Sequence, residues 1–210
     1  NANPHIGLAV GGYVRRAVGE RDRVRLPKGY RDNRKANAQL YLLNKLRSIA
    51  VGSALLRREA VDGLQFPEEL RIDEDTFFWA AALARTDTAI VQNLVLIYNV
   101  VHERHLDRFT VGAKSEFLGL AREIGKLGNH GIDNDVLKWR KGWIARRIAR
   151  AFITIGDPHS ARRFIRIAAA HPSIRWSPTT LRYSFRIWLD SLRVSPKPGA
   201  ASDPANRNSS

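Results

Sequence analysis

Residues 70–79 read Leu-Arg-Ile-Asp-Glu-Asp-Thr-Phe-Phe-Trp, with three consecutive carboxylates directly before an apolar run. The start of a helix favours acids, because its free N–H groups and its macrodipole carry partial positive charge. One cap needs only one acid, however, and three adjacent like charges repel each other. Two interpretations stay open: Asp73, Glu74 and Asp75 cap a helix, or they form a site that holds a carboxylate beside a reacting group.

Strand-like and helix-like segments alternate on both sides of these acids. The expected elements are a strand over 6–17, a short strand at 24–26, a helix over 36–47, a β-prone run over 49–56, a helical turn over 57–62, a helix over 76–84 and a strand over 88–101. Such alternation predicts an α/β fold in residues 1–109.

From about Thr110 to Val194 the apolar residues recur at helical spacing throughout. We expect helices over 111–127, 134–155, 160–170 and 179–192, because Gly-Asp-Pro and His-Pro breaks separate the later ones. Residues 195–210 lack an apolar face and are expected to be a disordered tail. The sequence therefore predicts a basic helical appendage over 110–194 and an all-helical C-terminal region.

The composition limits the chemistry and favours anionic partners. The 210 residues carry a net charge of +15 and contain neither cysteine nor methionine. Disulfides and thiolate catalysis are therefore excluded, and nucleic acid, acidic lipid or phosphate-bearing molecules are favoured. No apolar run approaches the roughly 20 residues that span a bilayer. Because the chain has no methionine and begins at Asn1, we expect that a piece of the protein precedes it.

Small residues, arginine, aromatic residues and acids follow one another in an order that resembles a known family. In chain order these are Gly52, Ser53, Arg57, Phe66, Glu74, Asp75 and Tyr98. Over residues 3–110 the pattern resembles the second half of a family 2 glycosyltransferase of the GT-A fold. The resemblance implies a partial GT-A-like, Rossmann-like mixed sheet, which is followed here by the helices.

The resemblance also implies a reaction, in which a sugar passes with inversion from a nucleotide-sugar donor to an acceptor hydroxyl. The hydroxyl loses its proton as it attacks, so a carboxylate must serve as general base. By resemblance that base is Asp75, while Glu74 orients the acceptor or supports the helix start and Asp73 is solvated. Cell-envelope or polysaccharide synthesis is the implied process.

Further site residues follow from the same resemblance. Gly52, Ser53 and Arg57 are expected to bind substrate, although the two small residues also suit close packing. Arg104 fits a bidentate phosphate contact, and His102 fits a metal ligand. An ordinary polar loop over 102–105 is the alternative for those two residues.

The same family needs an N-terminal nucleotide-binding half, in which an Asp-x-Asp motif holds Mg²⁺ or Mn²⁺ on the diphosphate. This chain has no Asp-x-Asp before residue 70. The spacing recurs at Asp73-Glu74-Asp75, but there it stands where the base belongs. We therefore expect a glycosyltransferase fragment whose isolated form is inactive.

The helical region is strongly basic, with thirteen Lys or Arg and two Asp over 136–194. Aromatic and basic residues interleave over 139–150, and again over 182–192, where Phe185 and Trp188 alternate with Arg182 and Arg186. Three interpretations stay open: solvated faces of packed helices, a membrane-surface contact, or phosphate contacts to nucleic acid, which no accompanying motif supports. We expect a cytoplasmic protein, and the membrane interpretation adds a peripheral position on the inner face of the cell membrane. The alternative function is a non-enzymatic basic module that binds anionic lipid or nucleic acid.

Overall fold

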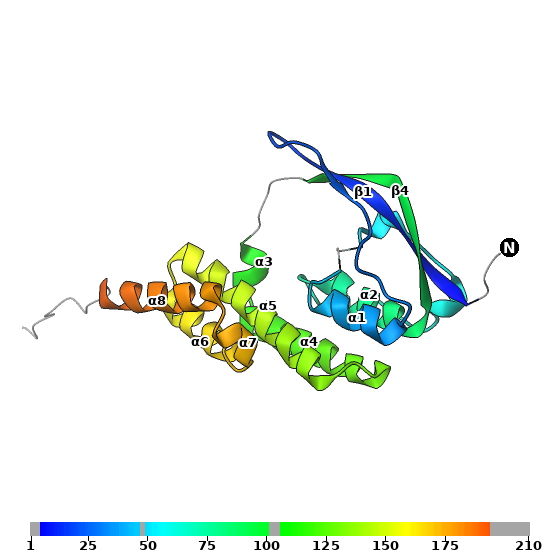
Figure 1. Cartoon of the computed structure of the whole chain (residues 1–210). Coiled ribbons are helices and arrows are strands. Elements are labelled where there is room, and N and C mark those ends of the chain that lie inside the picture. Colours follow the sequence, from blue (N-terminus) through cyan, green and yellow to red (C-terminus); the bar gives the residue numbers. More distant parts are fainter. Residues whose placement is uncertain (1–4, 47–48, 101–105, 194–210) are drawn as a thin grey trace, which may run out of the picture.

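The computed structural model describes residues 5–46, 49–100 and 106–193. A mixed α/β part comes first and a helical part follows it (Figure 1). The main elements are β1 (Ile6–Ala17), β2 (Arg23–Arg25), α1 (Arg34–Leu42), β3 (Ala54–Leu56), α2 (Glu74–Arg85), β4 (Asp87–Val100), α3 (Asp107–Thr110), α4 (Ala113–Lys126), α5 (Asn134–Ile155), α6 (Pro158–Ala168), α7 (Pro172–Arg175) and α8 (Pro178–Arg193). The predicted order, α/β and then helical, is confirmed. The predicted disordered tail, 195–210, lies outside the described residues.

The sheet is mixed and is built around β1. Strand β4 runs parallel to β1 along its length, with Val14 opposite Ile97. On the other edge of β1, β3 and β2 follow one another and are both antiparallel to it, with Leu8 opposite Leu56 and Tyr13 opposite Arg25. A parallel neighbour needs a crossover connection, and α1 and α2 lie in the long segment that separates β1 from β4.

The β-prone run over 49–56 is a strand only in its last three residues. Val51–Ser53 forms a 3₁₀ turn instead, in which the Ser53 hydroxyl donates to the Ala50 carbonyl at 2.9 Å. Periodicity cannot distinguish such a turn from a strand in a short apolar run.

The core of the α/β part lies between the sheet and the helices α1 and α2. Leu8 and Val10 of β1 are buried, as are Leu42 of α1 and Trp79 and Leu83 of α2. Helix α2 is buried from Thr76 to Leu83 without interruption. A helix that is apolar on all sides is buried on all sides, and here the sheet, α1 and the helical part surround α2.

The buried core continues from the α/β part into the helical part. One cluster of buried apolar residues contains Leu8 of β1, Phe117 of α4, Ile148 of α5 and Phe164 of α6. Helices α5 and α6 cross closely at Gly142, where an added Cβ would lie 3.1 Å from the Ala168 carbonyl oxygen. The helical part therefore packs on the α/β part through a shared core.

One buried arginine joins the two parts. The Arg140 side chain of α5 is 3% exposed. Its guanidinium donates to the Asp73 carboxylate at 2.8 Å, the Thr76 hydroxyl at 3.2 Å, the Asn44 side-chain oxygen at 3.0 Å and the Leu42 carbonyl at 3.3 Å. These acceptors belong to the end of α1 and the start of α2, so one side chain of α5 fixes both.

Strand β4 leaves much of its apolar surface uncovered. Its exposed apolar residues are Val91, Leu94, Val95, Ile97 and Tyr98, which are 39–53% exposed. Among the described residues, β4 pairs with β1 alone and forms an edge of the sheet. An exposed apolar edge strand is a pairing surface for other chain segments.

We expect Arg140→Ala to lower the free energy of unfolding by about 3–5 kcal/mol, because it leaves the Asp73 carboxylate buried with half of its pairing removed. Arg147, the other partner of Asp73, has a side chain that is 36% exposed, so Arg147→Ala is expected to cost about 1 kcal/mol or less. Urea unfolding followed by circular dichroism measures both. Arg122→Ala on the exposed face of α4 is the control, and a loss for Arg140→Ala no larger than for this control contradicts the expectation.

Candidate functional site

Asp73, the residue directly before α2, has a backbone conformation that the rest of the protein must hold. Asp73 has φ 58° and ψ 17°, in the left-handed region that side chains other than glycine rarely adopt. Such a residue costs about 1–3 kcal/mol and persists only where its surroundings fix it. Two helices of the C-terminal part supply those surroundings.

The first support is Glu116 of α4, whose side chain is 5% exposed. Its carboxylate accepts from the backbone N–H of Arg71 at 2.7 Å and from that of Ile72 at 3.3 Å. Arg71 also approaches the other carboxylate oxygen with its Nε, at 3.6 Å. A buried acid that accepts backbone N–H groups holds the loop in place.

The second support consists of two arginines of α5. One oxygen of Asp73 accepts from Arg140 at 2.8 Å, and the other accepts from Arg147. The Asp73 side chain is only 9% exposed, so the prediction that Asp73 is solvated is wrong. Its side chain forms no capping hydrogen bond to α2 either, because both oxygens point to the guanidinium groups.

The indole of Trp143 lies close to both arginines. Its ring centroid is 4.5 Å from the Arg140 guanidinium carbon and 4.8 Å from that of Arg147. Trp139 stacks on Trp143 with 6.4 Å between the ring centroids. These residues of the 139–150 segment therefore serve an internal contact rather than an open basic face.

Asp75 differs from Asp73 in its surroundings. It is half-buried in the first turn of α2, and within the described part of the chain its carboxylate has no salt bridge. Burial raises the pKa of Asp75 above its ordinary value, and the neighbouring Glu74 and Asp73 carboxylates raise it further. Burial raises the pKa of the Tyr41 hydroxyl, and the charge of Asp75 raises it further. Asp75 is therefore protonated more readily than an ordinary exposed carboxylate, which suits proton transfer.

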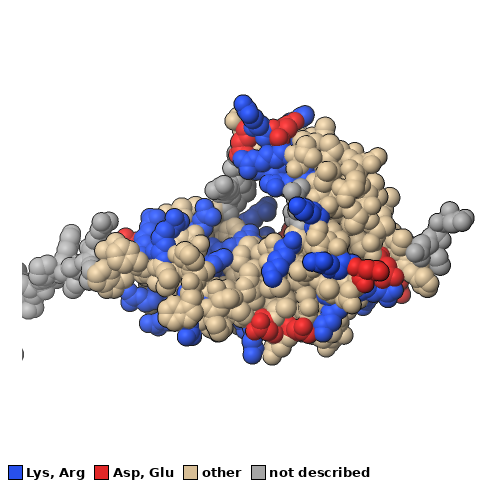
Figure 2. All heavy atoms as spheres, viewed as in Figure 1, with Lys and Arg blue, Asp and Glu red and all other residues tan. Residues whose placement is uncertain are grey.

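A cavity of about 900 Å³ lies beside the acids, between the end of β4, the loop before α2 and the helices α3 and α5. Its lining residues are Arg71, Ile72, Asp73, Glu74, Tyr98, Asn99, Leu106, Arg108, Phe109, Arg147, Arg150, Ala151 and Thr154. Figure 2 shows a hollow between the sheet and the helices, bordered by Lys and Arg side chains. Four arginines and two acids line the cavity, and Asp73 is neutralised by its partners, so the cavity favours an anionic ligand.

The structure brings only some of the predicted site residues together. Glu74 lines the cavity and Asp75 follows it directly in α2. Gly52 packs against Leu96 of β4, and buried Ser53 uses its hydroxyl within its own turn, so close packing accounts for both. His102 and Arg104 lie outside the described residues.

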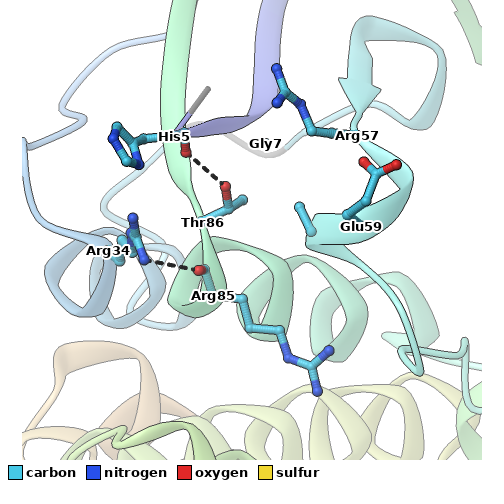
Figure 3. A pocket seen from close by; sticks show the side chains of 8 residues that line it. His5, Gly7, Arg34, Arg57, Glu59, Arg85 and Thr86 are labelled. Atoms are coloured by element: carbon cyan, nitrogen blue, oxygen red, sulfur yellow. Dashed lines mark hydrogen bonds between the residues drawn. The ribbon is translucent and has the colours of Figure 1, made fainter. Parts of the chain in front are cut away.

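Arg57 lines a different cavity, of about 660 Å³, at the opposite end of β4 (Figure 3). Arg34 lies there too, and it pairs with Asp87 at 2.6 Å and donates to the Arg85 carbonyl at 3.2 Å. Arg85 itself donates to the Asp62 carbonyl at 2.7 Å. These internal contacts hold the start of β4 to its neighbours, and Arg57 does not lie with Glu74 and Asp75.

The described residues do not fit a divalent metal ion. Among them, no group of three or more His, Asp or Glu side chains has the arrangement of a metal site. The literal Asp-x-Asp at Asp73 and Asp75 is unsuited as well, because two guanidinium groups occupy the oxygens of Asp73. The expected Mg²⁺ or Mn²⁺ stays a prediction.

Three residues that hold the site were not among the predicted ones: Glu116, Arg140 and Arg147. A signal for two of them exists in the sequence. Glu116 and Arg140 fall on the apolar faces of their helices, next to Phe117 and Leu120 in α4 and to Leu137 and Ile144 in α5. A charged residue at a core position of a helix needs a buried partner, but the sequence does not say which one.

Comparison of the chain with protein-family models, with curated proteins and with solved structures finds no match. What the site can do chemically therefore follows from its own geometry.

We expect Asp75→Asn to raise the free energy of unfolding near neutral pH. The raised pKa means that the folded state retains the proton to higher pH than the unfolded chain does. Stability from this group is therefore greatest below the ordinary value of 3.8 and falls as the pH rises through the folded pKa. Asparagine removes that loss, so in urea unfolding experiments at increasing pH the gain should grow through the folded pKa of Asp75 and then level off. Asp32→Asn, in the exposed loop before α1, should show no such gain, and a pH-independent difference for Asp75→Asn excludes the assignment.

Proposed function

We propose that this chain is the acceptor-side part of an inverting glycosyltransferase, with Asp75 as the general base. One observation carries the proposal: Asp75 is half-buried with a raised pKa and, unlike Asp73, has no salt bridge to an arginine in the described part of the chain. It stands at the start of a helix between β3 and β4 and directly follows Glu74, which lines the arginine-rich cavity. The order of residues that resembles family 2 glycosyltransferases has its base at this position.

The raised pKa of Asp75 fits the proposed reaction. The acceptor hydroxyl attacks the sugar while its proton passes to the carboxylate, and a base works best when its pKa approaches the working pH. Burial shifts the pKa of Asp75 in that direction. Glu74 lies on the cavity wall and orients the acceptor by accepting hydrogen bonds from the acceptor's hydroxyl groups.

The arginines of the cavity suit the other half of the reaction. The leaving group of a nucleotide-sugar is a diphosphate, whose charge grows as the bond to the sugar breaks. Arg71, Arg108 and Arg150 lie on the cavity wall and provide guanidinium groups that bind phosphate oxygens. No step needs a metal ion held by the described residues.

The uncovered apolar surface of β4 supports a role as one part of a larger domain. Five of its apolar residues are between 39% and 53% exposed, which is unusual for a sheet that is complete. A nucleotide-binding part that extends or covers the sheet would bury them.

We place the protein in the cytoplasm, where nucleotide-sugars are made, and its acceptor in cell-envelope or polysaccharide synthesis.

We expect Asp75→Asn to lower sugar transfer by about 10²- to 10⁴-fold, the usual contribution of a general base. The assay uses the full-length protein that contains this sequence, with a panel of radiolabelled nucleotide-sugars. Nucleotide binding, measured by calorimetry, should change little, because the amide keeps the shape of the side chain. Asp32→Asn should leave transfer unchanged.

Glu74→Gln separates the two acids. It should raise KM for the acceptor more than it lowers kcat, because a positioning group acts on binding. Near-normal turnover by Asp75→Asn rules out its role as base. Absence of transfer from every donor by the unsubstituted full-length protein rules out the proposed function.

A further inference from the structure

Helix α8 carries apolar side chains on two opposite sides. On one side Thr180, Tyr183 and Ile187 are 2–9% exposed and pack into the helical part. On the other side Leu181, Phe185 and Trp188, at positions i, i+4 and i+7, are 48%, 59% and 53% exposed. A helix on the surface of a soluble domain places polar residues on its second side, so this second stripe has no role in the fold described here.

Two aromatic rings of the exposed stripe stack on each other, and the stripe has a basic flank. The rings of Phe185 and Trp188 stack, with 5.8 Å between their centroids. Arg182 and Arg186 follow Leu181 and Phe185 by one position each and are exposed on one flank of the stripe. Over 158–193 the sequence contains seven arginines and a single acid, Asp190, which lies 3.8 Å from Arg186. The stripe therefore lies in a field of positive charge.

We propose that α8 binds flat on the surface of an anionic phospholipid bilayer. Leu181, Phe185 and Trp188 enter the headgroup region, and Arg182 and Arg186 contact lipid phosphates. Aromatic residues favour this depth because their rings are apolar and the indole N–H can stay hydrated. No helix in the described part of the chain is long and apolar enough to cross a membrane, and a helix that lies in the surface needs no such length.

Two other occupants fit this surface less well. A second copy of the chain would bring another set of arginines against Arg182 and Arg186, and like charges across an interface oppose association. Single-stranded nucleic acid binds in basic grooves with aromatic floors, whereas α8 lies on the outside of the helical part, away from the sheet (Figure 1). A flat, negatively charged surface suits a convex helix with this pattern.

The proposal is tested by co-sedimentation of the full 210-residue chain with vesicles of phosphatidylcholine, alone or mixed with phosphatidylglycerol. We expect binding to the mixed vesicles and little to the neutral ones. Arg182→Gln/Arg186→Gln should weaken binding to the mixed vesicles roughly 30-fold, from the typical contribution of an arginine near an anionic surface. Lys114→Gln/Arg122→Gln on exposed positions of α4 lowers the net charge equally and should change binding much less.

The aromatic stripe has its own variants. Phe185→Ser/Trp188→Ser should lose binding at least tenfold, whereas Leu118→Ser, at an exposed apolar position of α4 (57% exposed), should not. Because the double variant removes two large side chains, its circular dichroism must match that of the unsubstituted chain. Quenching of tryptophan fluorescence by brominated lipid gives a second readout, and Trp188→Phe should reduce the quenched fraction without loss of binding.

Each contrary result overturns the proposal. These results are equal binding to neutral and mixed vesicles, no binding to either, and equal losses for the α8 and α4 charge variants. If the α8 variants abolish a dimer seen by analytical ultracentrifugation while vesicle binding is unchanged, the stripe is an interface between copies. If they weaken retention of a single-stranded oligonucleotide and leave vesicle binding intact, the surface binds nucleic acid.

Discussion

The contact of Asp73 with Arg140 and Arg147 is the interaction on which the rest of the structure depends. It fixes the left-handed backbone conformation of Asp73 before α2 and joins α5 to the end of α1 and the start of α2. It also pairs both oxygens of the Asp73 carboxylate, which is only 9% exposed. Burial lowers the pKa of Arg140, and the charge of Asp73 acts in the opposite direction. Removing either partner of the buried Asp73–Arg140 pair lowers the free energy of unfolding strongly. The helical part is therefore needed to hold the loop before α2.

This arrangement gives the three neighbouring acids three different roles. Asp73 is neutralised by arginines and is structural, Glu74 lies on the wall of the cavity, and Asp75 is half-buried with a raised pKa. The differences come from partners, because the residue types are nearly identical. Burial and the neighbouring carboxylates raise the pKa of Asp75, and a carboxyl group with a raised pKa is a common participant in acid–base chemistry, which is the basis of its proposed role.

The basic residues of the helical part divide in the same way. Arg140 and Arg147 face inward around Trp143, whereas Arg182 and Arg186 face solvent beside Phe185 and Trp188. The two segments look alike in the sequence, since both alternate arginine with aromatic residues. Only the second leaves its aromatic rings exposed. The proposed contact with an anionic surface therefore uses the second segment, which presents both positive charge and apolar area.

The sequence by itself determined the elements and their order: β1 and α5 occupy the ranges that periodicity predicts, and the acids stand at the start of α2. Local patterns suffice for these features, because the spacing of apolar residues and the preference of acids for helix starts act over a few residues. Only the tertiary structure decided that Asp73 is buried, that Glu116 and Arg140 hold the acid loop, and that Arg57 lies at the other end of the sheet. These facts depend on partners 44 to 98 positions away in the chain, and no periodicity encodes which distant side chain will neutralise a buried charge.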